Sequence, residues 1–279
     1  TPIKKVDEKF QSLQALHKRM DEDEDILFLA EYVMRDDADV AVEGVINVTL
    51  PLPAIFAAHV HAALMGAVQQ PSAYGDRLDP ERGREIEQFI NYYLSDADRR
   101  LEARDEPTLR PFLTEQFNIR GRGAARLTST IDRGRLIPNI LPVDTRHLAY
   151  ETDEDGLAWV AYRTFRNANQ IRAEYPDFRG GGVASVPMPG EQPLLQVTDY
   201  WDRKENWVFV ANEQARDKVA HQYETPPFVI KTVPMGSMLK SKKAAGRQGE
   251  SIFFLVRPLI AEFNRLASIE QTINMTSIL

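Results

Sequence analysis

The sequence predicts an α+β fold, in which a helical N-terminal part precedes a mostly antiparallel sheet and one long helix closes the chain. Three successive regions of different hydrophobic spacing lead to this prediction. Apolar residues recur every three or four positions through about the first 110 residues, every second position from Leu127, and again at helical spacing from Ser251. Because a helix repeats every 3.6 residues and a strand every two, helices and strands occupy separate regions.

The composition is that of an ordinary globular protein of 279 residues, with 43% hydrophobic and 27% charged residues. This length accommodates one large or two medium domains. The chain has no cysteine, which excludes disulfides, thiol nucleophiles and cysteine metal sites. The net charge is −7, and residues 1–43 contribute −6 of it, with 6 basic and 12 acidic side chains. Since the remainder is close to neutral, the chain does not resemble a strongly basic nucleic-acid-binding protein.

The N-terminal region is predicted to hold four helices. In the first, one apolar face is formed by Val6, Phe10, Leu13, His17 and Met20. The acidic run Asp21–Asp25 is expected at the N-terminus of a second helix over 26–34, where the macrodipole favours negative charge. Thr49, Pro51 and Pro53 precede a third helix over 54–70.

The fourth helix opens at Asp79–Pro80, and its apolar stripe is the clearest in the chain. The stripe consists of Ile86, Phe89, Ile90, Tyr93, Leu94, Ala97 and Leu101. No signal peptide is expected, since residues 1–20 form a charged amphipathic stretch. The most apolar run, 50–68, holds two histidines and two prolines and falls short of the ~20 apolar residues of a membrane span, so it is expected to be a buried helix.

Turn signals then divide the predicted strands. Asp132–Gly134 is a turn before a strand over 135–141, and Pro138 places that strand at an edge or a bulge. Asp155–Gly156 joins strands over 148–151 and 157–165 as a hairpin. Asn167 is expected to cap a short helix that ends before Pro176. Further strands are predicted over 194–201, 207–211 and 228–233, polar loops over 178–193 and 234–250, and a long helix over 251–279.

No catalytic, metal or cofactor site is predicted. His59 and His61 are two residues apart on a helix, so they diverge too far to share a metal ion. Acidic residues at 153–155 lie at a hairpin tip, and Asp199 and Asp202 lie near a strand end, where solvated or turn roles are the simpler interpretation. Gly121–Gly123 lacks the third glycine and the preceding strand of a dinucleotide loop. We therefore expect a protein that is not an enzyme.

Basic residues cluster twice. The first cluster surrounds the start of the sheet and comprises Arg120, Arg122, Arg126, Arg133 and Arg135. We expect these arginines at a subunit interface, on the face opposite the acidic segment 1–43. The second cluster lies in the predicted polar loop over 234–250. Its residues, which we expect near DNA, are Lys240, Lys242, Lys243 and Arg247. Local charge alone places them there, and a solvated loop or salt bridges to a neighbouring subunit are alternative interpretations.

In their order along the chain, several segments resemble the portal, or head-to-tail connecting, proteins of podovirus-type tailed bacteriophages. INVTLPLPAIFAAHVHAALMGA (46–67) and IEQFINYYLSDADRRL (86–101) resemble two early helices of that family. NIRGRGAAR, LIPNILPVDTRHLAYE and DGLAWVAYRTFRNANQIRAEYP resemble its wing region, including a turn at Pro142, Asp144 and Arg146. TPPFVIKTVP (225–234) and GESIFFLVRPLIAEFNRLASIEQTINM (249–275) resemble its return into the core helices, where Gly249, Ser251, Pro258, Asn264 and Ser268 carry the likeness.

The resemblance implies a portal-like subunit of a ring of twelve copies at one capsid vertex. Double-stranded DNA passes through such a ring without sequence-specific contacts, and no membrane is involved. The expected partners are the major capsid protein, the terminase large subunit and the head–tail adaptor or tail proteins. The expected location is the virion, after assembly in the cytoplasm of the host bacterium, and no cofactor is expected.

Three regions follow from these expectations: a helical part of the wing (1–115), a β-rich wing (116–250) and the start of a long core helix (251–279). The chain is expected to be part of a longer protein, because family members are longer. Two alternatives remain open. One is another head–tail adaptor or internal virion protein, and the other is an α+β metal-dependent hydrolase, against which the lack of a ligand-spaced His/Asp/Glu cluster argues.

Overall fold

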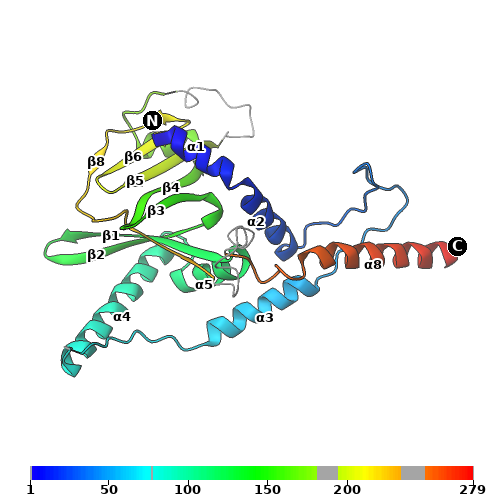
Figure 1. Cartoon of the computed structure of the whole chain (residues 1–279), viewed down its shortest axis with the longest axis horizontal. Helices are drawn as coiled ribbons and strands as arrows, with labels where there is room; N and C mark the ends of the chain where they lie inside the picture. The colour runs from blue at the N-terminus through cyan, green and yellow to red at the C-terminus, as the bar shows by residue number, and fades with distance from the viewer. Residues whose placement is uncertain (1, 77, 181–193, 234–248, 279) are drawn as a thin grey trace. The chain divides into compact units, whose positions relative to one another are not determined.

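The computed structural model of the chain describes residues 2–76, 78–180, 194–233 and 249–278 (Figure 1). The predicted α+β class, the antiparallel sheets and the long C-terminal helix are confirmed. The helices of the described residues are α1 (Pro2–Ser12), α2 (Gln14–Leu27), α3 (Leu52–Gly66), α4 (Pro80–Glu102), α5 (Leu109–Glu115), α6 (Ala168–Glu174) and α8 (Arg257–Ile278). A π-helical turn, η1 (Gln116–Arg120), and a 3-10 turn, η2 (Thr145–His147), accompany them.

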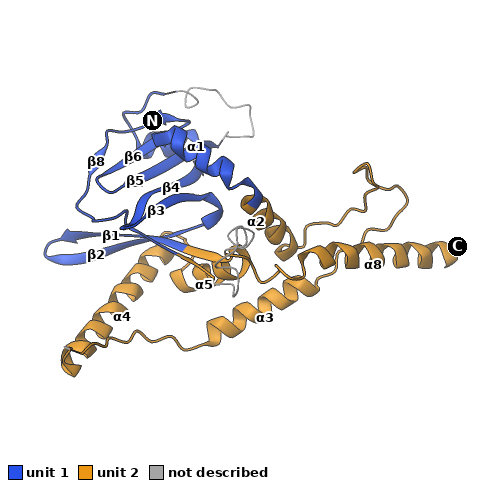
Figure 2. Ribbon diagram, viewed as in Figure 1, with its two compact units in different colours: residues 1–15, 124–230 blue, residues 16–123, 231–279 orange. Residues whose placement is uncertain are grey.

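The chain forms two compact units (Figure 2). Unit 1 consists of residues 1–15 and 124–230, and unit 2 consists of residues 16–123 and 231–279. Each unit therefore combines stretches that are far apart in the sequence. The division into 1–115, 116–250 and 251–279 follows the type of secondary structure and stays a prediction.

Unit 1 is built around antiparallel strands. They are β1 (Arg122–Asp132), β2 (Arg135–Val143), β3 (Leu148–Asp153), β4 (Gly156–Arg166), β5 (Leu195–Asp202), β6 (Glu205–Val210), β7 (Glu213–Gln214), β8 (Val219–Ala220) and β9 (Phe228–Thr232). One sheet has the order β3-β4-β5-β6-β7, with β8 also paired to β6, and the other has the order β2-β1-β9. Among the strands of the described residues, the sequence did not predict the two-residue strands β7 and β8, which are too short to show a periodicity, or the part of β1 before Leu127.

The predicted turns of unit 1 are confirmed. Glu154 and Asp155 connect β3 to β4, which begins at Gly156. Strand β2 with Pro138 lies at a sheet edge, where a missing N–H is tolerated. Asn167 accepts a hydrogen bond from the Gln170 N–H (2.9 Å) at the start of α6, while Gln170 returns one to the Asn167 N–H (3.0 Å). This reciprocal pair is a capping box.

Alternate residues of the larger sheet of unit 1 enter different apolar clusters. On one face, α1 packs through Val6 against a cluster with Ala149, Trp159, Ala161, Tyr200 and Phe209. On the other face, α6 contributes Ile171 to a cluster with Phe178, Val197, Val208, Val210 and Ala215. Both faces of the sheet are therefore covered. Tyr200 lies in the first of these clusters, and its burial raises the pKa of its hydroxyl to about 12.

Unit 2 is mainly helical, and one of its predicted helices is wrong. The acidic run Asp21–Asp25 does not precede a helix over 26–34; it forms the last turns of α2, which ends at Leu27. The chain then leaves the helix, and Leu29 adopts a φ of 55°. Acidic side chains oppose the macrodipole at a helix C-terminus, but Asp23 and Glu24 each pair with an arginine of unit 2. These tertiary ion pairs outweigh the local preference.

The other predicted helices of unit 2 are present with shifted ends. Helix α3 ends at Gly66 rather than residue 70, and α4 begins where Asp79 accepts a hydrogen bond from the Arg82 N–H (3.4 Å). Helix α8 begins at Arg257 rather than Ser251. Pro258 therefore lies in its first turn, a position that needs no backbone N–H donor.

Candidate interaction surface

Helix α3 is apolar around its circumference, yet most of it is exposed, contrary to the expectation of a buried helix. Its sequence contains no charged residue, and within this fully described helix only Ala57 is buried. Its large exposed side chains are Leu52, Ile55, Phe56 and Leu64. A helix that is hydrophobic on every side is normally buried, and a contiguous exposed apolar surface normally marks a contact with another molecule. Helix α3 is therefore a candidate interaction surface.

Helix α8 has the reverse of the usual amphipathic pattern. Its exposed side carries large apolar residues at helical spacing, namely Leu259, Phe263, Leu266 and Ile273, together with the exposed acids Glu262 and Glu270. The opposite side carries polar residues, of which Asn264 and Ser268 are buried. The polar side chains form hydrogen bonds within the chain, so the side with the apolar residues faces outward.

The inward side of α8 binds an extended backbone segment through three side chains, which we call the polar ladder: Asn264, Ser268 and Thr272. Asn264 Oδ1 accepts a hydrogen bond from the Leu50 N–H (3.0 Å). The hydroxyls of Ser268 and Thr272 accept from the N–H groups of Val48 and Ile46, each at 2.9 Å. The two hydroxyls also donate to carbonyls four residues earlier in the helix, so both of their hydrogen-bonding functions are used.

Helix and strand dimensions explain the ladder. Four residues of a helix rise about 6 Å, and two residues of an extended chain rise about 6.6 Å. Every second N–H of residues 46–50 can therefore meet every fourth side chain of α8. On the other side of this segment, the side chains of Asn47 and Thr49 accept hydrogen bonds from the N–H groups of Met34 (2.9 Å) and Tyr32 (2.8 Å).

Removal of one ladder side chain should detach the extended segment locally. In Ser268→Ala the Val48 N–H loses its acceptor, and we expect the free energy of unfolding to fall by about 1–3 kcal/mol. Hydrogen exchange at Val48 should accelerate. The control is Ser277→Ala, an exposed serine whose hydroxyl bonds only within α8, which should change stability by less than about 0.5 kcal/mol. Equal effects of the two variants would contradict the assigned role.

A buried ion network fixes the start of α8 to α2. Arg257 makes two hydrogen bonds to the Asp23 carboxylate (2.7 and 2.6 Å) and a longer one to Glu250 (3.4 Å). Glu250 also pairs with Arg19 (3.1 Å). Burial opposes the charged form of Arg257, but the hydrogen bonds and charges of Asp23 and Glu250 outweigh it and raise its pKa.

The segment around Gly121 passes very close to the segment before α8. Gly121 and Gly249 both have positive φ, 66° and 78°, and a Cβ on Gly121 would overlap the carbonyl group of Gly249. The Ile252 N–H donates to the Asn118 carbonyl (2.9 Å), and the Val233 N–H donates to the Gly121 carbonyl (2.9 Å). These glycines therefore serve a close backbone approach within unit 2.

The structure separates the five arginines that were expected at a subunit interface. Arg120 is buried and binds the Met20 carbonyl (2.7 Å) and Glu24 (3.0 Å) of its own chain. Arg122 is also buried, and Arg126 pairs with Asp199. These three side chains are thus used inside the chain. Arg133 and Arg135 are exposed at the β1–β2 turn, and their interface role stays a prediction.

Of the other basic residues, Lys240, Lys242, Lys243 and Arg247 lie outside the described residues, so their predicted proximity to DNA stays a prediction.

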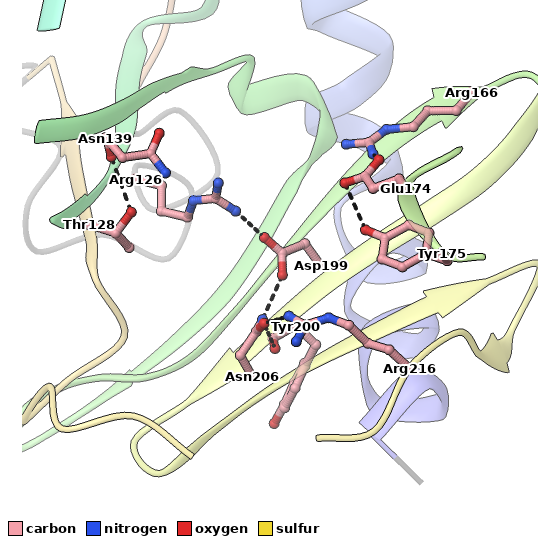
Figure 3. Close-up of polar contacts among 10 residues, drawn as sticks. All are labelled: Arg126, Thr128, Asn139, Arg166, Glu174, Tyr175, Asp199, Tyr200, Asn206 and Arg216. Atoms are coloured by element: carbon pink, nitrogen blue, oxygen red, sulfur yellow. Dashed lines mark hydrogen bonds and ion pairs between the residues drawn. The ribbon is translucent and has the colours of Figure 1, made fainter. Parts of the chain in front are cut away.

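Arg126 belongs to a polar network that joins the two sheets of unit 1 (Figure 3). Asp199 on β5 accepts hydrogen bonds from Arg126 on β1 and from the Asn206 side chain on β6 (2.6 Å). Arg216 in turn donates to the Asn206 side-chain oxygen. The Asp199 carboxylate therefore has a structural role. Asp199 lies within β5, paired with Tyr162 and Val208, and not near a strand end as the sequence had indicated.

The remaining candidate chemistry is dispersed. Asp153 and Asp155 at the β3–β4 hairpin tip both pair with Arg203. Across residues 2–76, 78–180, 194–233 and 249–278, no group of three or more His, Asp or Glu side chains is placed to hold a metal ion. In the same part of the chain, no helix combines the length and apolar character needed to cross a membrane.

Unit 2 also contains an open groove of about 520 Å³. Its apolar lining includes Ile26, Leu29, Val33, Leu50, Pro258 and Ile260, and its acidic lining consists of Glu22, Asp25 and Glu31. The sequence did not indicate this groove, because its walls come from three separate stretches of chain, 22–33, 49–53 and 257–264.

The comparisons with known proteins add no assignment: no protein-family model matches the chain, and no curated protein matches its sequence.

Proposed function

We propose that this chain is a portal-type structural subunit, which assembles with copies of itself into a ring for the passage of double-stranded DNA. The sequence resemblance is the source of the proposal. The observation that carries it furthest is the exposure of apolar residues on α3 and α8, which suits contacts between subunits. A ring needs two different complementary surfaces on each subunit, joined head to tail.

Charge also supports a conduit for DNA. Each lysine or arginine that neutralises a phosphate adds affinity, with a salt dependence of about −0.9 per contact for duplex DNA. A strongly basic lining repeated around a ring would hold DNA too tightly for it to slide. The net charge of −7 is compatible with loose contacts. In this proposal, the terminase large subunit, adaptor or tail proteins and the capsid protein bind the ring at one vertex of the virion.

Electron microscopy of the intact protein, combined with mass photometry, tests this function. We expect closed rings with a central hole wide enough for duplex DNA, and a mass that is a whole multiple of the subunit mass. A stable monomer at every concentration would overturn the proposal. An assembly without rotational symmetry would instead favour an adaptor or an internal virion protein, and metal-dependent hydrolysis of a substrate panel would favour the hydrolase alternative.

A further inference from the structure

We propose that the tip of the β1–β2 hairpin, Ile131–Leu136, docks into the acidic apolar groove of a second copy of this chain. This inference rests on the proposed ring, and it names the two surfaces that would meet in its head-to-tail contact. The tip belongs to unit 1 and the groove to unit 2, so each subunit offers one of each.

The hairpin tip is a small protruding element with an apolar face. Ile131 and Leu136 are directly opposite each other in the β1–β2 register, so both side chains lie on the same face of the hairpin. They are 77% and 43% exposed. Strand β9 pairs with β1, and the Leu127 N–H of β1 donates a hydrogen bond to the carbonyl of Pro227, just before β9 (2.7 Å). The β1–β2 hairpin extends beyond the end of β9 (Figure 1).

The tip has a defined shape. Arg133 and Gly134 form the two-residue turn with φ values of 46° and 77°, and positive φ at both positions is the geometry of a type I′ turn that matches strand twist. A rigid turn loses little conformational freedom on docking. The turn also fixes Arg133 at the apex and Arg135 on the face opposite the apolar pair.

The groove has complementary chemistry. Its apolar lining can receive the Ile131–Leu136 pair, whose exposure to water is unfavourable. Among the described residues, three acidic side chains line it, of which Glu22 also pairs with the exposed Lys18 (3.8 Å), and the one basic lining residue, Arg257, is held by Asp23 and Glu250. The tip carries Arg133, Arg135 and Asp132, a net charge of +1. The opposite net charges of tip and groove favour this pairing over contact between two identical surfaces.

Charge reversal on each surface tests the contact. The tip variant is Arg133→Glu with Arg135→Glu, and the groove variant combines Glu22→Lys, Asp25→Lys and Glu31→Lys. We expect each variant alone to lose at least 90% of its rings in mass photometry. An equal mixture of the two variants should form rings again. In a ring where the variants alternate, each reversed tip meets a reversed groove and each unmodified tip meets an unmodified groove, so every contact joins opposite charges. Recovery by mixing requires the contact to lie between chains.

The control is Arg82→Glu with Arg84→Glu, which makes the same charge change at two exposed residues of α4. This variant should assemble like the unmodified protein. If the tip and groove variants also form rings, the inference is overturned and the proposed function stands. If the unmodified protein forms no assembly, both are overturned.

Because the chain has no cysteine, cross-linking provides a measurement that does not depend on charge. Ile131→Cys and Val33→Cys are prepared as separate proteins, mixed and oxidised. We expect a cross-linked dimer of the two proteins within the assembly, and little cross-link in a mixture of Ile131→Cys with Ser277→Cys. Equal cross-linking in the two mixtures, or none in either, contradicts docking of the tip in the groove.

Discussion

Gly121→Ala should be among the most destabilising single substitutions in this chain, with a loss of at least about 4 kcal/mol in the free energy of unfolding. Two costs combine. A left-handed backbone costs a non-glycine residue about 1–2 kcal/mol, and the new methyl group would also overlap the Gly249 carbonyl. Neither backbone can move without breaking the hydrogen bonds between the two segments, such as that from the Ile252 N–H to the Asn118 carbonyl.

Gly134→Ala is the matched control for this prediction. Gly134 has a φ of 77°, similar to that of Gly121, but a Cβ there would have no neighbour within 4 Å. We expect a loss of only about 1–2 kcal/mol, the backbone cost alone. Urea unfolding of both variants measures the difference, and similar losses would mean that the close approach to Gly249 contributes nothing.

Asp23→Ala should lower the free energy of unfolding by about 3 kcal/mol, the lower end of the usual cost of breaking a buried ion pair, because the Arg257 side chain is 14% exposed. Asp23 is 2% exposed and supplies both of the short hydrogen bonds to Arg257. The remaining partner, Glu250, is farther away at 3.4 Å and is shared with Arg19. Loss of the pair should also free the start of α8, which hydrogen exchange in residues 257–261 would detect.

Asp25→Ala is the control on the same helix. Asp25 is exposed, so its removal should change stability by less than about 0.5 kcal/mol. Chemical unfolding at neutral pH compares the two variants. A loss below about 1 kcal/mol for Asp23→Ala would mean that the network is solvated and contributes little, as most surface ion pairs do.

Local signals predicted much of the fold. Asp79–Pro80, Asn167 and Asp155–Gly156 mark a helix start, a capped helix and a hairpin, and the structure has all three. Each signal works through bonds to residues nearby in the sequence, which is why the sequence alone is sufficient. The helix over 26–34 failed for the opposite reason, because Asp23 obtains its partner from Arg257, 234 residues away.

The candidate surfaces were harder to predict. The uncharged helix over 54–70 was visible in the sequence, but its hydrophobicity suggested burial, and only the structure gives the exposure of Phe56 and its neighbours. The polar ladder did leave a signal, since Asn264, Ser268 and Thr272 recur every four residues and therefore lie on one side of the helix. Such a stripe indicates a polar partner, but not that the partner is a backbone.

The ladder couples the lengths of two segments that are more than 200 residues apart. Its hydrogen bonds repeat every four residues in α8 and every two in the extended segment, so an insertion of one residue between Ile46 and Leu50 would present the wrong amides to the helix. Evolutionary changes in length within the ladder should therefore be coupled, with two residues gained in the extended segment for every four gained in the helix. Single insertions should be confined to the turns outside it.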